Sequence, residues 1–193
     1  MMRKEAIETL VDNFIGRKEK PFVISSTGLI SRELYSYRDQ PEFFYMTGSL
    51  GLASSIALGV AISKPEKRFV AIDGDAALLL NMGSLATIAH FAPKNLVHIL
   101  LDNNAYGSCS EEPSFSQTVD LREMAIAAGY PLTARVEDEE ALFSTTSEFL
   151  KRDGPSFIHA VIEVGGERDL PRPLNLPSIA KRFRQRLINE KKP

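Results

Sequence analysis

Two short runs of consecutive apolar residues, within Arg68–Ile72 and Leu96–Leu101, constrain the fold of this chain more than any other feature. A strand with one solvated face alternates apolar and polar residues, whereas a strand covered by helices on both faces is apolar throughout. Segments with helical spacing separate the short apolar runs along the chain. The pattern therefore predicts an α/β fold, a doubly wound parallel sheet with helices on both faces.

The remaining elements continue this alternation. We predict further strands over Phe22–Ser25, Phe43–Met46, Leu132–Val136 and Ser156–Val164. Helices are expected over Glu5–Arg17, Arg32–Tyr37 (with Ser31 as its N-cap), Ala53–Ile62, Ala77–Phe91, Leu121–Ala128 and Glu139–Lys151. Residues 108–119 are polar and lack periodicity, which indicates a loop of the length that often carries function.

The C-terminal part has a different composition. Three prolines follow Gly165-Gly166, and a basic helix is then expected from about Ser178 to Glu190. This segment carries Lys181, Arg182, Arg184 and Arg186. We therefore divide the chain into two parts, a domain at residues 1–175 and a basic helical tail at residues 176–193. The face of the tail helix that carries the basic residues is expected to be either solvated or in contact with another subunit.

Composition excludes several classes of function. A net charge of −2 gives no basic field, so nucleic acid is not an expected partner. The single cysteine, Cys109, excludes an internal disulfide and any multi-cysteine metal site within this chain. No apolar run is long enough to span a membrane, and acidic residues interrupt the N-terminal segment that a signal peptide would need. We expect a cytoplasmic protein.

Three segments with small or polar residues follow predicted strands: 48–51, 73–77 and 102–107. Ligands of open parallel sheets bind beyond the carboxyl ends of the strands. Carboxylate, amide and carbonyl oxygens are ligands that Mg²⁺ takes, and Mg²⁺ completes its octahedron with phosphate and water. The N–H groups of Ala76 and Ala77, at an expected helix start, suit a phosphate. The sequence therefore indicates a site for a metal and a phosphate at this edge of the sheet.

The run from Gly74-Asp75-Ala76 to Asn103 resembles the thiamine diphosphate motif, with 28 positions between Asp75 and Asn103. The resemblance implies that the side chains of Asp75 and Asn103 and the carbonyl of Ala105 bind Mg²⁺. Asp102 replaces the first asparagine of the usual pair, so Asn104 is a rival ligand. Leu50 lies 25 positions before Asp75, where relatives place an apolar residue that holds the cofactor bent.

Longer stretches resemble a narrower family. VISSTGLISRELYSYRD, FYMTGSLGLASSIALGVAI, AIDGDAALLLNMGSLATIA and DLPRP are similar to the cofactor half of phosphonopyruvate decarboxylases and to the beta subunit of sulfopyruvate decarboxylases. Ala76 (in place of glycine) and Cys109-Ser110-Glu111-Glu112 depart from the usual pattern. The resemblance implies a cofactor site made by Thr27, Gly28, Gly48, Ser49, Leu50, Gly74, Asp75, Ala76, Ala77, Asn103, Ala105 and Tyr106.

The same resemblance implies a function. The chain would be the diphosphate-binding subunit of a decarboxylase that converts sulfopyruvate or phosphonopyruvate into CO₂ and an aldehyde, with thiamine diphosphate and Mg²⁺ as cofactors. The essential glutamate would come from a pyrimidine-domain alpha subunit, because none in this chain matches it. A hetero-oligomer is therefore expected, with the helix Ala53–Ile62 and the exposed strand ends facing the partner.

Other interpretations stay open at this point. Asp75 and Asn103 could be a helix cap and a turn, Leu50 a core residue, and Thr27-Gly28 a plain turn. Arg32 either binds the acid group of the substrate or lies on the surface. We expect Cys109 and the three histidines (His90, His98 and His159) not to take part in catalysis. Alternative functions are the beta subunit of another thiamine-dependent 2-oxo acid enzyme, an oxidoreductase or a synthase, and a non-catalytic assembly domain.

Overall fold

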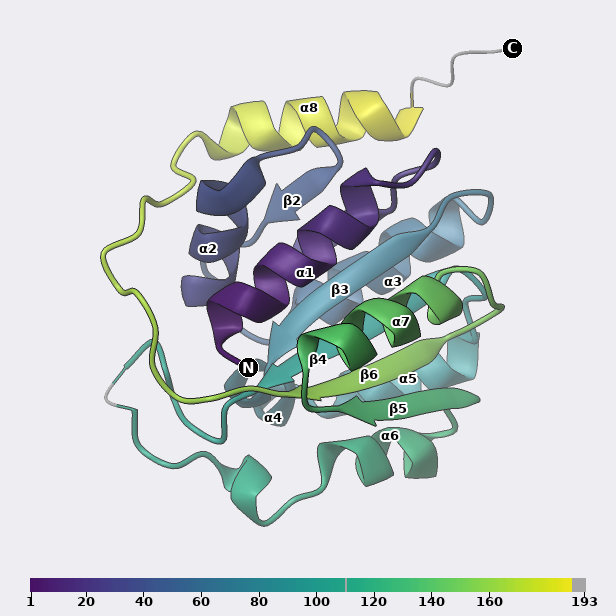
Figure 1. Cartoon of the computed structure of the whole chain (residues 1–193). Helices are drawn as coiled ribbons and strands as arrows, with labels where there is room; N and C mark the ends of the chain where they lie inside the picture. The colour runs from purple at the N-terminus through teal and green to yellow at the C-terminus, as the bar shows by residue number, and fades with distance from the viewer. Residues whose placement is uncertain (110, 189–193) are drawn as a thin grey trace.

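The computed structural model describes residues 1–109 and 111–188, which form a six-stranded, all-parallel sheet (Figure 1). The strand order is β2-β1-β3-β4-β6-β5. The strands are β1 (Phe22–Ser25), β2 (Phe43–Tyr45), β3 (Phe69–Gly74), β4 (Leu96–Asp102), β5 (Leu132–Val136) and β6 (Ser156–Val161). This confirms the predicted α/β class with a parallel sheet.

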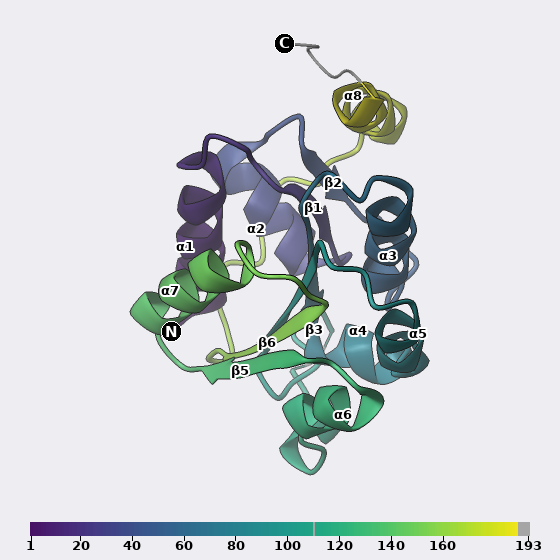
Figure 2. The same ribbon diagram turned by 90° about the vertical axis from the view of Figure 1, so that its right-hand side faces the viewer.

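Helices cover both faces of the sheet (Figure 2). One layer contains α1 (Arg3–Ile15), α2 (Leu29–Arg38) and α7 (Glu139–Phe149). The other contains α3 (Ala53–Ser63), α4 (Asp75–Leu80), α5 (Gly83–Phe91) and α6 (Leu121–Ala128). The short 3₁₀ helix η1 (Phe115–Gln117) precedes α6, and α8 (Leu176–Ile188) follows the last strand.

Two hydrophobic clusters explain the apolar runs. On β3, Val70 and Ile72 pack into the cluster under α1 and α7, while Phe69 and Ala71 pack into the cluster under α3 and α5. Successive residues of a strand point to opposite faces, so each face needs its own apolar residues. Burial on both sides is therefore the reason that this strand shows no alternation.

Two predicted helices differ from the observed ones. The helix predicted over Ala77–Phe91 is divided into α4 and α5, because Asn81 leaves helical geometry and its side-chain amide donates to the carbonyl of Gly51 at 2.8 Å. The second helix begins at Leu29, with Gly28 as its N-cap at φ +91°. Ser31 is therefore not a cap: it is buried in α2, and its hydroxyl donates to the carbonyl of Ser26 at 2.7 Å.

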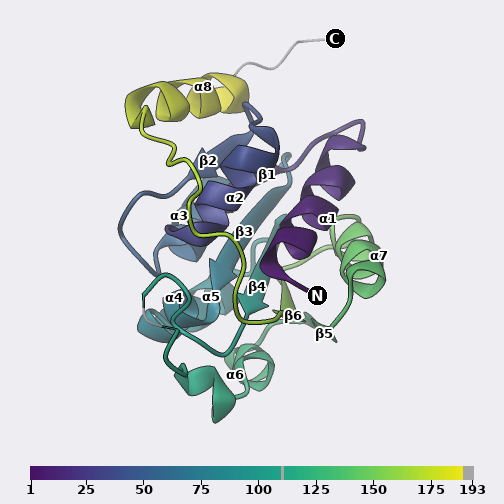
Figure 3. The same ribbon diagram turned by 60° about the vertical axis from the view of Figure 1, so that its left-hand side comes forward.

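The chain reverses its direction of winding between β1 and β3. From β1 the chain passes through α2 to β2 on one side, and later returns to place β3 on the other side of β1. At such a switch point the loops from the two strand ends diverge and leave a crevice. Residues 103–109, residues 111–120 and the segment 162–175 lie at this edge, and the last of these crosses from β6 to α8 (Figures 1 and 3).

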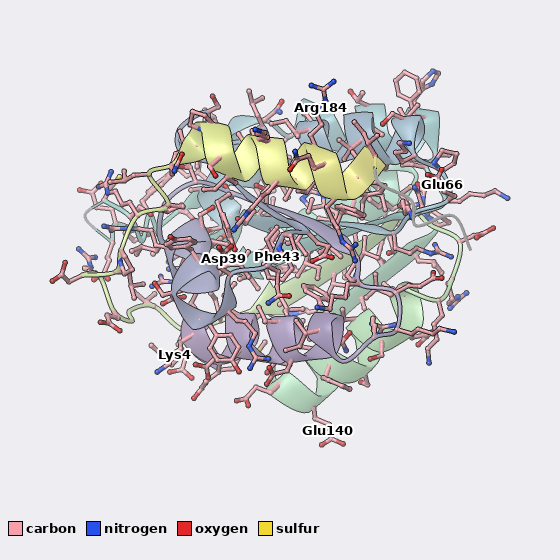
Figure 4. All side chains as sticks on the ribbon, turned by 90° about the horizontal axis from the view of Figure 1, so that it is seen from above. Lys4, Asp39, Phe43, Glu66, Glu140 and Arg184 are labelled. Atoms are coloured by element: carbon pink, nitrogen blue, oxygen red, sulfur yellow. The ribbon has the colours of Figure 1, made fainter. Side chains whose placement is uncertain are left out.

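The C-terminal helix α8 packs against the β2 edge of the sheet. Phe183 contacts Phe22 edge to face, with ring centroids 5.4 Å apart, and Arg182 and Arg186 pair with Asp39 and Glu42. Arg184 lies on the side of α8 away from Asp39 (Figure 4). The basic tail thus packs on its own chain through two of its three arginines, and residues 189–193 lie outside the described part.

No helix among the described residues is long and apolar enough to cross a membrane. The cytoplasmic location and the boundary between residues 175 and 176 stay predictions.

Candidate cofactor-binding site

A cavity of about 110 Å³ lies at the carboxyl ends of β1, β3 and β4, at the switch point of the sheet. Nine of the twelve predicted cofactor-binding residues line it: Thr27, Leu50, Gly74, Asp75, Ala76, Ala77, Asn103, Ala105 and Tyr106. Gly28 and Gly48 line a neighbouring cavity that shares Thr27, and Ser49 lines neither. The three separate sequence segments therefore meet at one place.

Asp75 is the first residue of α4, directly after β3, and it is 3 % exposed. Its carboxylate accepts a hydrogen bond from the hydroxyl of Ser114, and the hydroxyl oxygen of Ser116 lies 3.4 Å away. Burial raises the pKa of Asp75, the hydroxyl of Ser114 opposes that rise, and the nearby Asp102 carboxylate adds to it. A cation at this carboxylate would offset the cost of burying its charge.

The turn after β4 presents Asn103 to the crevice. Asn103 is buried, and its side-chain oxygen accepts the N–H of Ala105 at 3.3 Å. Asn104 adopts the left-handed conformation at φ +55°, and its side-chain oxygen lies 3.2 Å from the hydroxyl oxygen of Ser116. Asn103 and Ala105 line the crevice, whereas Asn104 is not one of its lining residues. The turn thus places Asn103 at the crevice and Asn104 outside it.

Asp102 supports this turn from the end of β4. One carboxylate oxygen lies 2.8 Å from Nε2 of His159, and the other accepts the N–H of Asn104 and the hydroxyl of Ser116, both at 2.8 Å. Burial alone would raise the pKa of Asp102, but these hydrogen bonds lower it below its ordinary value. The carboxylate therefore has partners on both oxygens, and His159 has a structural role.

Leu50 lies at the mouth of the crevice, 42 % exposed, and so is not a core residue of this chain. Its turn has positive φ at Gly48, Ser49 and Gly51. A Cβ at Gly51 would lie 2.9 Å from the carbonyl of Ala77, so only glycine fits there. The N–H of Gly48 donates to the Thr27 hydroxyl at 2.8 Å. The turn is thereby fixed against both α4 and the end of β1.

The donor set fits a magnesium ion bound together with a diphosphate. Asp75, Asn103 and Ala105 offer a carboxylate, an amide and a carbonyl oxygen around one cavity. Among the described residues there is no cluster of three or more His, Cys, Asp or Glu. Mg²⁺ suits such an incomplete oxygen set, because it completes its coordination with phosphate oxygens and water.

The family model for the C-terminal TPP binding domain of thiamine pyrophosphate enzymes matches residues 24–160. The chain belongs to this family. The match includes the ends of β1, β3 and β4, and so contains the whole set of predicted metal ligands. The crevice is therefore at the ligand-binding edge of a thiamine pyrophosphate (TPP) binding domain.

Named relatives lie close in sequence. The chain is 41% identical over 164 residues to a phosphonopyruvate decarboxylase of Streptomyces hygroscopicus, covering 84% of this chain and 41% of that protein. It is 39% identical to the sulfopyruvate decarboxylase subunit beta of Methanothermobacter thermautotrophicus, covering 88% of each. The TPP-binding chain thus spans about two fifths of the first relative and most of the second.

Solved structures show the same fold. The benzoylformate decarboxylase of Polynucleobacter necessarius superposes with a TM-score of 0.70 at 18% identity, over 85% of this chain and 33% of that one. At this identity the likeness concerns the fold alone.

Sequence reasoning missed several residues at and around the crevice. Arg3 lines the crevice and forms a buried bidentate pair with Glu33, at 2.8 and 3.0 Å. The two residues belong to different helices, so no local pattern could reveal the pair. Ser114 and Ser116 were placed in a loop, and only the length of that loop hinted at their contacts with Asp75.

Proposed function

We propose that this chain is the TPP-binding part of a thiamine diphosphate- and Mg²⁺-dependent decarboxylase that acts on sulfopyruvate or phosphonopyruvate and releases CO₂ and an aldehyde. The observation that carries the proposal is the meeting of Asp75, Asn103, Ala105 and Leu50 around one crevice at the switch point. The names of the relatives, at about 40% identity, support the substrate class.

In this proposal the metal binds Asp75, Asn103 and the carbonyl of Ala105, and Asn104 serves the turn. The diphosphate lies against Thr27, Gly28, Ala76 and Ala77, and Leu50 supports the cofactor from the side of the β2–α3 turn. When bound, thiamine diphosphate supplies the carbon nucleophile and the electron sink for the loss of CO₂. The protein's own task is to hold that group in one orientation and to exclude water around it.

We further propose that a pyrimidine-domain subunit covers the crevice and supplies the glutamate. The surface that supports this lies next to the site: α3 has no charged residue, and Leu52, Ile56 and Leu80 are exposed. Leu80 of α4 is 67 % exposed, which is unusual for a large apolar side chain beside a binding site. Burying these side chains against a second subunit would also enclose the mouth at Leu50.

The test is product release by the reconstituted pair of subunits. We expect CO₂ and aldehyde from sulfopyruvate or phosphonopyruvate, and much less from pyruvate. Reduction of an electron-acceptor dye with 2-oxo acid and coenzyme A would instead identify an oxidoreductase. Condensation of two pyruvate molecules would identify a synthase, and inactivity with every 2-oxo acid, despite assembly, would identify an assembly domain. Each of these three outcomes would contradict the proposed decarboxylase activity.

A further inference from the structure

A second cavity, of about 530 Å³, adjoins the cofactor crevice. The two cavities share Thr27, Leu29 and Ser108. The walls of the second cavity come from the start of α2, the turn after β2, residues 172–174 near the end of the segment that crosses from β6 to α8 (Figure 3), and Leu176 at the start of α8. None of the predicted metal ligands lines this cavity.

The charged groups of this cavity all have one sign. Arg32 of α2 and Arg172 of the crossing segment line it, and no Asp or Glu of the described chain does so. Nη1 of Arg32 donates to the carbonyl of Arg168 at 3.2 Å, and its Nε is buried with no hydrogen-bond partner among the described residues. Arg172 forms no ion pair with any residue that the structure describes. Within residues 1–109 and 111–188, no carboxylate thus neutralises either guanidinium group.

The crossing segment is held in place beside the crevice. Arg168 pairs with Glu111 at 2.6 Å and donates to the carbonyl of Gly107 at 3.4 Å. Together with the bond from Arg32, these contacts tie the segment to the loop that follows β4 and to α2. Arg172 is four residues further along this segment, where it is exposed and lines the second cavity.

We propose that Arg32 and Arg172 form the subsite that binds the distal sulfonate or phosphonate group of the substrate. This inference rests on the proposed function. The diphosphate of the cofactor is assigned to the crevice with Asp75 and Asn103 and to Thr27 and Gly28, on the wall where the two cavities meet. Neither guanidinium group belongs to that assigned set, so the two arginines are available for another anion. A 3-sulfo or 3-phosphono 2-oxo acid carries that anion beyond its keto carbon, and guanidinium groups bind such oxyanions with paired hydrogen bonds. Met46, Pro173 and Leu174 supply apolar walls that strengthen the contact.

The test compares variants in the complex with the partner subunit. Arg172→Gln should raise KM for sulfopyruvate or phosphonopyruvate roughly ten- to hundredfold, the effect of losing a charge-assisted contact, with kcat changed much less. Arg172→Lys should recover part of the loss, and Arg32→Gln should behave like Arg172→Gln. Arg184→Gln, on the exposed side of α8, is the matched control and should leave KM unchanged.

Two further measurements separate this inference from the proposed function. Thiamine diphosphate affinity should be the same in Arg172→Gln and wild type; a parallel loss of cofactor affinity, or an unchanged KM, overturns the subsite. Calorimetry on the same complexes measures the binding of 3-sulfopropanoate, which does not react, and of propanoate, which lacks the sulfonate group. If the wild type decarboxylates no 2-oxo acid, the proposed function fails, and the binding of 3-sulfopropanoate then decides the subsite. Binding by the wild type that is lost in Arg172→Gln supports the subsite. Equal binding by both proteins, or no binding by the wild type, overturns the subsite.

Discussion

Nε2 of His159 lies 2.8 Å from a carboxylate oxygen of Asp102, and the other oxygen of Asp102 accepts the N–H of Asn104. This buried pair connects β6 to the turn that presents Asn103. Asp102 stands where the family's motif has its first asparagine. The carboxylate can keep that place because a histidine on the neighbouring strand satisfies it.

His159→Gln should weaken both folding and the site. Removing one partner of a buried polar pair costs about 1–3 kcal/mol, and the Asn103 turn loses its support. We expect a lower melting temperature and weaker Mg²⁺-dependent cofactor binding, measured by calorimetry. His98→Gln is the matched control, because His98 also pairs with a buried aspartate, Asp73 at 3.1 Å. It should destabilise the fold without weakening cofactor binding; equal effects of the two variants would count against a positioning role.

Leu50→Ala should lower kcat at least tenfold, because the cofactor is no longer held in the reactive orientation. The melting temperature of the chain alone should change little, since Leu50 is 42 % exposed there. Turnover of the reconstituted enzyme is the measurement. Ile126→Ala, at an exposed position of α6, is the control with a similar truncation. Full turnover in a correctly assembled Leu50→Ala enzyme would remove this residue from the site.

Ile56→Asp should abolish assembly with the pyrimidine-domain subunit while the chain itself stays folded. Ile56 is exposed on α3, so the charge costs little until a partner covers it. Analytical ultracentrifugation of the mixed subunits measures the effect, with Ile126→Asp as control. Unchanged association of the Ile56→Asp variant would move the interface to another face.

The attachment of α8 should depend on pH. Burial raises the pKa of Asp39, but hydrogen bonds from Arg182 and Tyr45 outweigh it and hold the pKa below 3.8. A depressed pKa in the folded state gives stability that is complete above the unfolded pKa and is lost as pH falls through the folded one. The stability difference between wild type and Asp39→Asn, measured by urea unfolding, should therefore be largest above about pH 4 and should shrink as the pH is lowered further. A constant difference over this range would mean that the carboxylate charge contributes nothing.

The sequence predicted the sheet and most of the crevice because the signals were local or motif-like. The apolar run over Arg68–Ile72 reflects burial on both faces, and the spacing of Asp75 and Asn103 reflects two adjacent strand ends. The division of α4 from α5 depends on a bond from Asn81 to Gly51, 30 positions away, and so left no periodic signal. The pair of Arg3 with Glu33 was hidden for the same reason.

In the proposed site, Asp75 and Asn103 hold Mg²⁺ and, through it, the diphosphate of the cofactor. Calorimetric titration of thiamine diphosphate into the reconstituted complex, with Mg²⁺ and with a chelator, tests this most directly. The wild-type complex should bind thiamine diphosphate at least tenfold more tightly with Mg²⁺ than with the chelator. Asp75→Asn should lose this difference in affinity, whereas Asp153→Asn, a surface control, should keep it. Equal affinity and equal metal dependence in wild type and Asp75→Asn would contradict the claim.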